Sequence, residues 1–462
     1  MNSYRRRMTT STAPAVQPET DQTGGLLSTA HRATTIGIFA LVSLHAFESL
    51  ALTTVMPTIA KDLDGASLYA MAFTATLAAG IVSVVWSGNL ADRRGPRLPL
   101  LIGLLLFALG LVGAGLAPTM PVLVATRVVQ GLGAGMTSTA LYVLVTRVYP
   151  ARLHTAVFAG FAAAWVVPSV VGPFVAGLIT QSLGWRWVFG LSLLVLVVAA
   201  GLLGRILPAL RQPLAAVPWR RRAIVASVTL AVAVLVLNAA AGEAGTGAIL
   251  SAAAATVVLV ASLRPLLPRG TLTARRGLPT DVTVRGLSFA AFAGAEIYLP
   301  RLLTERDGFP PALAGLSLTA TGVTWFVGSS IQGRWSSRFE IGRTVRFGLA
   351  VEAVALAALA IGVALDAPAW VLIALFPLVG FGIGTLAPRV TTQALGRADD
   401  DNQGFVSSAL QIGDSAGAAT ALSTTAILFA VAGSVVPGAY VVVFAAAAVP
   451  ALLGWLIALR VR

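Results

Sequence analysis

The feature that most constrains the fold is a series of long apolar runs separated by short polar loops. Most of the runs are about 18 to 25 residues long, which lets an α-helix cross a hydrocarbon core roughly 30 Å thick. The runs are too long and too continuous for the alternating strands of a membrane barrel. With 57% hydrophobic and 11% charged residues, the chain has more apolar surface than a soluble core would bury. The sequence therefore predicts an all-α polytopic membrane protein.

The apolar runs form groups of six, two and six, fourteen in all. They lie near 34–58, 68–87, 98–117, 121–146, 155–180, 186–204, 223–240, 247–263, 283–300, 311–332, 345–365, 368–394, 403–433 and 436–459. This grouping predicts a disordered tail over 1–32, a six-helix bundle over 33–207, a linker with two extra helices over 208–280 and a second six-helix bundle over 281–462.

The positions of the basic residues predict the orientation in the membrane. A net charge of +14 would suggest a nucleic-acid partner in a soluble protein, but here most arginines, Arg285 among them, are expected in loops on the side of both termini. We therefore expect cytoplasmic termini and no nucleic-acid partner. An even count of twelve spans would give the same orientation. The single lysine among 32 basic residues suggests a GC-rich bacterial genome, so we expect a bacterial cytoplasmic membrane.

A charged turn at residues 88–97 joins the second and third runs, and its outline returns 245 residues later. Asp92 in this turn is expected to accept hydrogen bonds from Arg93 or Arg97, or to approach a helix N-terminus in the other half. The alternative is an ordinary basic loop, which leaves Asp92 and the glycines unexplained. Ser337 stands where Asp92 would fall in the later copy. The residues expected to form a conformational switch are Gly88, Asp92, Arg93, Gly95, Arg97, Arg147, Gly333 and Arg338.

A second repeat joins the fourth and twelfth runs. The glycine triplet at residues 131–135 returns at residues 380–384, an offset of 249. Glycines inside membrane helices usually permit close helix contact, which explains the triplet better than nucleotide binding does. Parallel repeats of six helices characterise one large class of secondary transporters.

Several motifs carry a family resemblance. The turn has the form G-x-L-A-D-R-x-G-x-R, and residues 123–131 place Arg127 before glutamine and glycine inside a span. A helix-five motif, G-x-x-x-G-P-x-x-G-G, is matched in part by Pro168, Gly172, Pro173 and Gly177. The chain thus resembles the major facilitator superfamily, and within it the fourteen-helix drug:proton antiporter branch.

The resemblance implies two six-helix bundles with two extra central transmembrane helices, and a transporter rather than an enzyme. It implies transport that is driven by a proton gradient and needs no cofactor. The expected partners are a small-molecule substrate, protons and membrane lipids. Glu48 lies nine residues before Pro57, the spacing of the branch's helix-one motif, although glutamate replaces the usual aspartate. A monomer is expected. The absence of cysteine leaves no thiolate metal site, and none of another kind is expected.

Ionisable residues inside spans are expensive and are therefore the default functional candidates. Glu48 and Asp414 are the main candidates for proton coupling, with Glu296 as a weaker one near the outer end of its span. His45 lies three residues before Glu48 on one helical face and is expected to tune or relay the proton. Structural alternatives stand beside these roles. Glu48 could pair with an arginine or a hydroxyl of a neighbouring helix, and interfacial solvation would explain Glu296. Glu352 is expected to pair with Arg346 or another helix. The residues expected to face a central cavity are Glu48, Arg127, Gln130, Trp165, Pro168, Glu296, Gln411 and Asp414.

The sequence thus predicts a proton-coupled exporter of small, largely hydrophobic compounds that works by alternating access. The alternatives within transport are an exporter of a lipid or endogenous metabolite and a nutrient:proton symporter, because a fold does not fix its substrate. A non-transporting receptor or scaffold is a further alternative, disfavoured by the acidic residues in spans of both halves.

Overall fold

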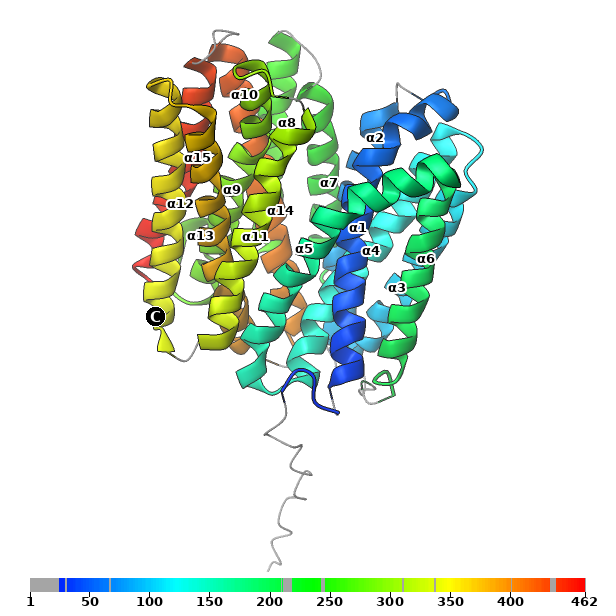
Figure 1. Ribbon diagram of the computed structural model, residues 1–462. Coiled ribbons are helices and arrows are strands. Elements are labelled where there is room, and N and C mark those ends of the chain that lie inside the picture. The colour runs from blue at the N-terminus through cyan, green and yellow to red at the C-terminus, as the bar shows by residue number, and fades with distance from the viewer. Residues whose placement is uncertain are drawn as a thin grey trace, which may run out of the picture.

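The computed structural model describes residues 25–461 except 30, 66–67, 209, 211–217, 242–245, 310, 336–337, 400 and 433–437. All regular elements in this part of the chain are helices, joined by short loops (Figure 1). The helices are α1 (Arg32–Asp62), α2 (Tyr69–Arg94), α3 (Arg97–Gly115), α4 (Met120–Val148), α5 (Ala151–Ser182), α6 (Arg186–Gly204), α7 (Arg221–Ala241), α8 (Thr246–Leu266), η2 (Thr271–Thr273), α9 (Leu278–Glu296), α10 (Tyr298–Glu305), α11 (Pro311–Trp335), α12 (Ile341–Ala364), α13 (Ala369–Gly396), α14 (Gln403–Ala432) and α15 (Gly438–Ala458). The predicted all-α class is confirmed.

Nine candidate membrane spans within the described residues are long and apolar enough to cross a bilayer. The protein is therefore a multi-pass membrane protein, whereas the count of fourteen spans stays a prediction. The start of α1 and the end of α15 lie at the same end of the molecule (Figure 1). We call this the terminal end. Most of the predicted tail, residues 1–24, lies outside the described residues, as does Ser337.

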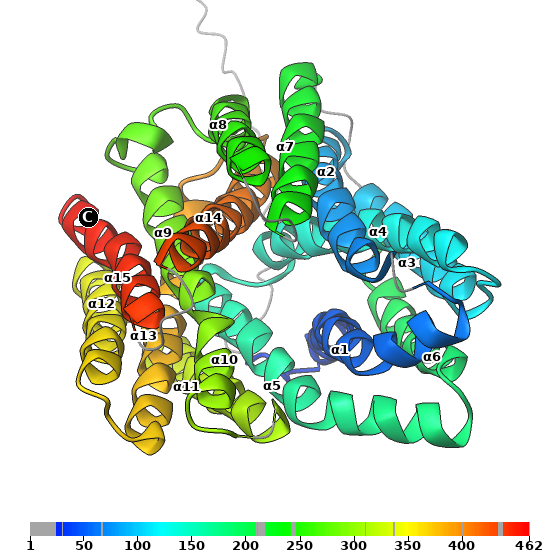
Figure 2. The same cartoon turned by 90° about the horizontal axis from the view of Figure 1, so that it is seen from above.

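The helices pack in two groups, α1 to α6 and α9 to α15 (Figure 2). In the first group α4 packs against α2 and α3, and α1 packs against α5 and α6. The second group repeats this arrangement, because α13 packs against α11 and α12, and α9 packs against α14 and α15. We call these groups the N-half and the C-half, and the surface where they meet the seam.

The glycine triplets explain the closest contacts within each half. A Cβ added at Gly131 would lie 2.2 Å from the backbone oxygen of Thr76 in α2, and one at Gly133 would lie 2.3 Å from the backbone nitrogen of Phe107 in α3. The second triplet behaves alike, since a Cβ at Gly380 would lie 2.3 Å from the backbone oxygen of Thr321 in α11. The triplets therefore bring α4 and α13 against their neighbours, as small residues do in membrane helix packing.

Two local signals end or interrupt helices near the candidate site. Pro300 has no N–H to donate to the Glu296 carbonyl one turn earlier, and α9 gives way to α10 at Ile297. Gly95 ends α2 with φ 73° and ψ 174°, a backbone conformation that favours glycine, and Pro96 follows as the cap of α3. The charged turn is therefore a tight corner between two long helices.

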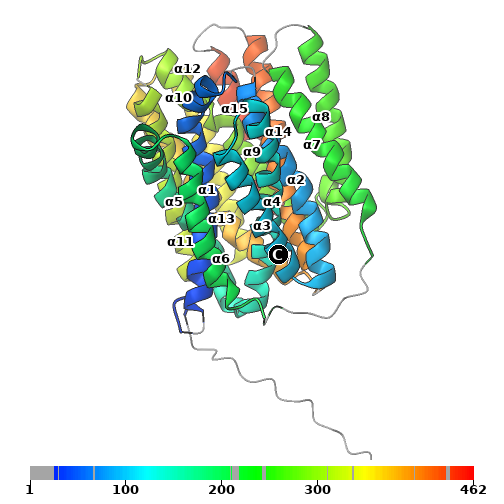
Figure 3. The same cartoon turned by 90° about the vertical axis from the view of Figure 1, so that its right-hand side faces the viewer.

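The two extra helices, α7 and α8, pack against each other on the outside of the molecule (Figures 2 and 3). Along their length α7 contacts α2 of the N-half, and α8 contacts α14 of the C-half. They therefore sit beside the seam and do not form a third bundle.

Candidate functional site

A closed polar cluster surrounds Glu48 inside the N-half. Gln130 Nε2 donates to Glu48 Oε2 at 2.7 Å, and Ser192 Oγ donates to Oε1 at 2.6 Å. Arg127 Nη1 lies 3.4 Å from Glu48 Oε2 and 2.5 Å from Gln130 Oε1. The side chains of Arg127 and Glu48 are only 6% and 7% exposed. We call Glu48, Arg127, Gln130 and Ser192 the N-half cluster. It joins α1, α4 and α6 and satisfies both carboxylate oxygens.

His45 lies one turn before Glu48 but has other partners. Its Nε2 is 3.3 Å from the hydroxyl of Thr137 in α4, and its ring packs edge-on against Phe107 at 5.0 Å between centroids. Within the described chain the carboxylate of Glu48 bonds to the N-half cluster and not to this imidazole. His45 and Glu48 therefore form no direct hydrogen bond, because the imidazole ring of His45 faces Thr137.

Asp414 forms a buried ion pair with Arg285. Arg285 Nη2 donates to Asp414 Oδ2 at 2.7 Å and Nε donates to Oδ1 at 3.0 Å. Arg285 Nη1 also donates to the hydroxyl of Thr391, and its Nη2 lies 3.4 Å from the hydroxyl of Tyr142 in the N-half. The side chains of Arg285 and Asp414 are 6% and 13% exposed. We call Arg285 and Asp414 the seam pair.

The assignment of Arg285 to a loop was wrong. The helix α9 begins at Leu278, so Arg285 lies two turns inside it and is buried. The apolar run begins near residue 283, so hydropathy places Arg285 at its edge. The sequence signal for Arg285 is a buried acid without a cation in its own span: Asp414 in α14 needs an arginine from a helix packed against it, and α9 is such a helix.

Gln411 connects the halves one turn before Asp414. Its Oε1 accepts from Ser138 Oγ at 2.7 Å, and its Nε2 donates to the Thr139 hydroxyl at 3.2 Å. Nearer the terminal end, Thr146 Oγ1 donates to Gln403 Oε1 at 2.8 Å. These bonds line the seam from Ser138 to Thr146 of α4, about 12 Å of helix. The seam is closed here by polar contacts.

The two remaining acids have few partners. Glu352 is fully buried in α12, and Ser288 Oγ donates to its Oε1 at 2.6 Å, while Oε2 has no partner among the described residues. Of the two pairings expected for Glu352, the one with Arg346 is wrong, since Arg346 Nε donates to the Gly342 carbonyl. The partner comes from another helix, because Ser288 lies in α9. Glu296 is half-buried at the last residue of α9, beside the break at Ile297.

The helix-five residues all lie in α5, which bends along its length (Figure 2). Pro168 is buried, whereas Trp165 is 45% exposed. A Cβ at Gly172 would meet the Phe47 ring of α1 at 3.4 Å, and one at Gly177 would meet nothing within 4 Å. Pro173 lies in the helix, but its side chain is outside the described set. Pro168 and Pro173 have no backbone N–H to donate within α5, and such a missing hydrogen bond favours a bend in a helix.

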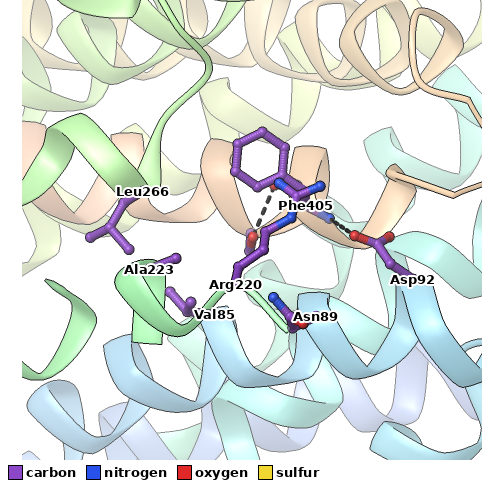
Figure 4. Close-up of a pocket in the computed structure, with 8 residues that line it drawn as sticks. Val85, Asn89, Asp92, Arg220, Ala223, Leu266 and Phe405 are labelled. Atoms are coloured by element: carbon purple, nitrogen blue, oxygen red, sulfur yellow. Dashed lines mark hydrogen bonds between the residues drawn. The ribbon is translucent and has the colours of Figure 1, made fainter. Parts of the chain in front are cut away.

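Asp92 bonds to a helix N-terminus in the other half. Its Oδ1 accepts from the Gly404 N–H at 2.6 Å and its Oδ2 accepts from the Phe405 N–H at 3.1 Å, at the start of α14 (Figure 4). A Cβ at Gly88 would lie 2.5 Å from the Gly404 carbonyl oxygen, so the glycine permits this approach. We call Gly88, Asp92, Gly404 and Phe405 the latch. Of the partners predicted for Asp92, the carboxylate bonds to the helix N-terminus of the other half.

The other switch residues lie around the latch and its repeat. Arg93 stacks over the Trp219 ring at 4.9 Å, and Arg97 begins α3. Arg147 ends α4 next to Thr146, which bonds to α14. In the repeat, a Cβ at Gly333 would lie 3.0 Å from Ala159 Cβ of α5. The exposed Arg338 follows α11.

A second buried ion pair was also missed from the sequence. Asp281 is fully buried in α9, and Arg397 Nη1 donates to its Oδ2 at 2.7 Å. Both residues lie just outside the apolar runs predicted at 283–300 and 368–394. The first turn of α9 therefore lies within the protein and not at its surface.

A family model described as Major Facilitator Superfamily matches residues 38–422. The chain belongs to this superfamily. Its members are transporters of small molecules, not enzymes. A probable multidrug-efflux transporter of Mycobacterium tuberculosis is 29% identical over 387 residues, covering 79% of this chain and 81% of the relative.

Solved structures of the superfamily share the fold. The proton:xylose symporter XylE aligns with a TM-score of 0.66 at 15% identity, covering 92% of this chain and 94% of that one. The human organic anion transporter MFSD10 aligns with a TM-score of 0.69 at 16% identity, covering 92% and 98%. A bacterial homologue of the iron transporter ferroportin, in an outward-facing state, has a TM-score of 0.64 at 13% identity, covering the same shares. At these identities the likeness concerns the fold alone.

Proposed function

We propose that the protein is a proton-coupled antiporter that exports small, largely hydrophobic compounds such as drugs by alternating access. The observation that carries the proton coupling is the seam pair, because it places a buried carboxylate and an arginine where the two halves meet. Buried charges at such a place are the parts of a membrane protein most directly changed by a proton.

Protonation of Asp414 would remove the charge that holds Arg285. The guanidinium would keep Thr391 of the C-half and Tyr142 of the N-half as neutral acceptors. A charged group in a dry site that loses its counter-ion is strongly destabilised, so the seam would rearrange to hydrate it. This links the arrival of a proton to the opening of the terminal end. We assign Asp414 as the main coupling residue.

Glu48 has a second role in this proposal. Its carboxylate has all its partners inside the N-half, so its protonation would loosen α1 from α4 and α6 without touching the seam. We assign the N-half cluster to proton or substrate binding on the N-half wall of the cavity. Gln411, Trp165, Pro168 and Glu296 complete the proposed substrate pathway.

The direction and substrate class come from similarity. The relative named a probable multidrug-efflux transporter supports export of drug-like compounds. The helix-five motif in α5 supports it in part. An exporter of a lipid or endogenous metabolite, or a nutrient:proton symporter, remains the second candidate, since the similar fold of XylE serves a proton:xylose symporter. The fourteen-span branch, a monomeric state and cytoplasmic termini in a bacterial membrane belong to the same proposal.

The proposal is tested by transport into inverted vesicles from an efflux-deficient bacterium that expresses the protein. Lipophilic dyes are added with an imposed proton gradient, with and without a protonophore. We expect uptake that the protonophore abolishes and that Asp414→Asn abolishes at equal expression. Glu296→Gln serves as a comparison with a less central acid. Full gradient-driven uptake by Asp414→Asn and by Glu48→Gln would overturn the coupling assignment.

A further inference from the structure

The helices α7 and α8 lie on the outer side of the molecule (Figures 2 and 3). A groove of about 540 Å³ lies between them. Its lining includes Arg221, Arg222, Val225, Val258, Ala261 and Pro265. The groove has two chemical zones, because the arginines begin α7 while the apolar residues continue along both helices.

The arginine zone carries uncompensated charge. Both Arg221 and Arg222 are exposed, and neither side chain forms a hydrogen bond or ion pair within the described part of the chain. The exposed Arg343, by contrast, has a partner in Glu340 at 3.0 Å. The exposed Arg275 and Arg276 form no ion pair within the described residues either, but they lie outside the groove. Two adjacent free guanidiniums at the head of a groove form a site for a divalent or phosphate-type anion, which arginine binds with paired N–H groups.

The second zone is apolar and faces outward. Val225 is 66% exposed and Val258 is 41% exposed. The polar groups in this zone, Thr229 and Ser262, donate to carbonyls of their own helices at 3.1 Å and 2.7 Å. The wall therefore offers contact to a hydrocarbon chain and no hydrogen bond that a soluble anion would need.

We propose that this groove is a binding site for an anionic phospholipid. The phosphate of the headgroup lies between Arg221 and Arg222, and an acyl chain lies along Val225 and Val258. A basic pocket between membrane helices near one bilayer face is the arrangement that holds such headgroups. Free phosphate would use the arginines alone, whereas a lipid uses both zones.

The site adjoins the latch. Arg220 precedes the two arginines directly, and its guanidinium stacks over the Phe405 ring of α14 at 4.0 Å. It also lines a small cavity with Asp92 and Asn89 (Figure 4). A lipid that fixes the start of α7 would therefore fix a residue in contact with the latch.

The test is native mass spectrometry of the full-length protein titrated with phosphatidylglycerol or with phosphatidylcholine. We expect a phosphatidylglycerol adduct that resists collisional removal and that phosphatidylcholine does not reproduce. Because each arginine near a membrane surface contributes about fivefold to anionic-lipid affinity, R221A/R222A is expected to weaken binding by about 25-fold. The exposed pair R275A/R276A, outside the groove lining, is the matched control and should leave binding unchanged.

A second variant separates the two zones. V258W keeps both arginines and fills the apolar wall, so phosphatidylglycerol should bind to it more weakly. In the parent protein, inorganic phosphate added as a competitor should not displace the phosphatidylglycerol adduct. Equal lipid binding by R221A/R222A and the control pair would overturn the proposal. Displacement of the adduct by millimolar phosphate, with V258W unaffected, would assign the arginines to a soluble anion and also overturn it.

Discussion

Two of the buried pairs of acid and arginine, the one in the N-half cluster and the seam pair, differ in where their neighbours come from. The N-half cluster is complete within one half, since Glu48, Arg127, Gln130 and Ser192 lie on α1, α4 and α6. The seam pair has neighbours in both halves, since Arg285 of the C-half also contacts Tyr142 of the N-half. One pair therefore stabilises a half, and the other connects the halves.

This difference suggests that two similar chemical units serve different steps. A proton on Glu48 would change the interior of the N-half, whereas a proton on Asp414 would change how the halves meet. The comparison is open to experiment because the chain has no cysteine, so a spin label on an introduced cysteine reports on one chosen site. Arg94 and Arg343 are exposed and belong to opposite halves, at the end of α2 and near the start of α12, which suits them as label sites.

The largest expected effect is the loss of one arginine. Both R127M and R285M leave a buried carboxylate without its cation, and each is expected to lower the free energy of unfolding by about 3–5 kcal/mol. Only R285M should lengthen the distance between labels at positions 94 and 343. Unfolding in detergent and spin-label distances measure the two effects.

The double variant R285M/D414L is the control for this prediction, because it removes the charge together with its partner. It should regain most of the stability that R285M loses. If R127M separates the labels as much as R285M does, the two pairs are not functionally distinct.

The sequence predicted the helical class and the repeat because both depend on local signals. Apolar runs mark helices in a membrane, and the triplets near Gly131 and Gly380 indicate close contacts that the structure describes. It also predicted that Asp92 could meet a helix N-terminus across the seam. These outcomes follow from periodicity and from the chemistry of a single residue type.

The partners of the acids were harder to predict. The arginine of the seam pair, Arg285, was placed in a loop because hydropathy alone does not separate the first turns of a helix from its loop. The direction of His45 toward Thr137, rather than Glu48, depends on how α1 is rotated against α4. Such rotations are set by packing between helices, which one sequence does not reveal.

The next largest effect tests whether the latch belongs to the seam. D92N keeps the shape of the side chain but removes the charge that accepts from the Gly404 and Phe405 N–H groups. Since hydrogen bonds to charged groups contribute about 1.5–3 kcal/mol, the closed terminal end should lose a comparable amount of stability. The label distance between positions 94 and 343 should shift toward the longer population.

The matched control for D92N is S337A, at the corresponding place in the repeat. It removes a hydroxyl where no acid stands, so a smaller shift is expected. Equal shifts in D92N and S337A would return the charged turn to the status of a basic loop.

A smaller difference is expected between the two switch glycines. In G88A the new methyl group would meet the Gly404 carbonyl oxygen at 2.5 Å, while in G333A it would meet the Ala159 methyl at 3.0 Å. Overpacking costs about 1–3 kcal/mol, and the backbone contact at Gly88 has less room to adjust. We expect G88A to slow transport and separate the labels more than G333A. The reverse order would indicate that α5 and α11, rather than α2 and α14, control closure.

The smallest effect concerns the contact that distinguishes the two pairs. Y142F removes the hydroxyl that lies 3.4 Å from Arg285, and because this separation is long, a change at the low end of the usual range of about 0.5–1.5 kcal/mol is expected. S192A removes the 2.6 Å bond to Glu48 and is the corresponding change in the N-half cluster. If the seam pair connects the halves, Y142F should shift the label distance while S192A should leave it unchanged, although S192A removes the shorter bond. A shift in S192A with none in Y142F would mean that the halves are connected through the interior of the N-half. Glu48, and not Asp414, would then be the residue whose protonation opens the seam.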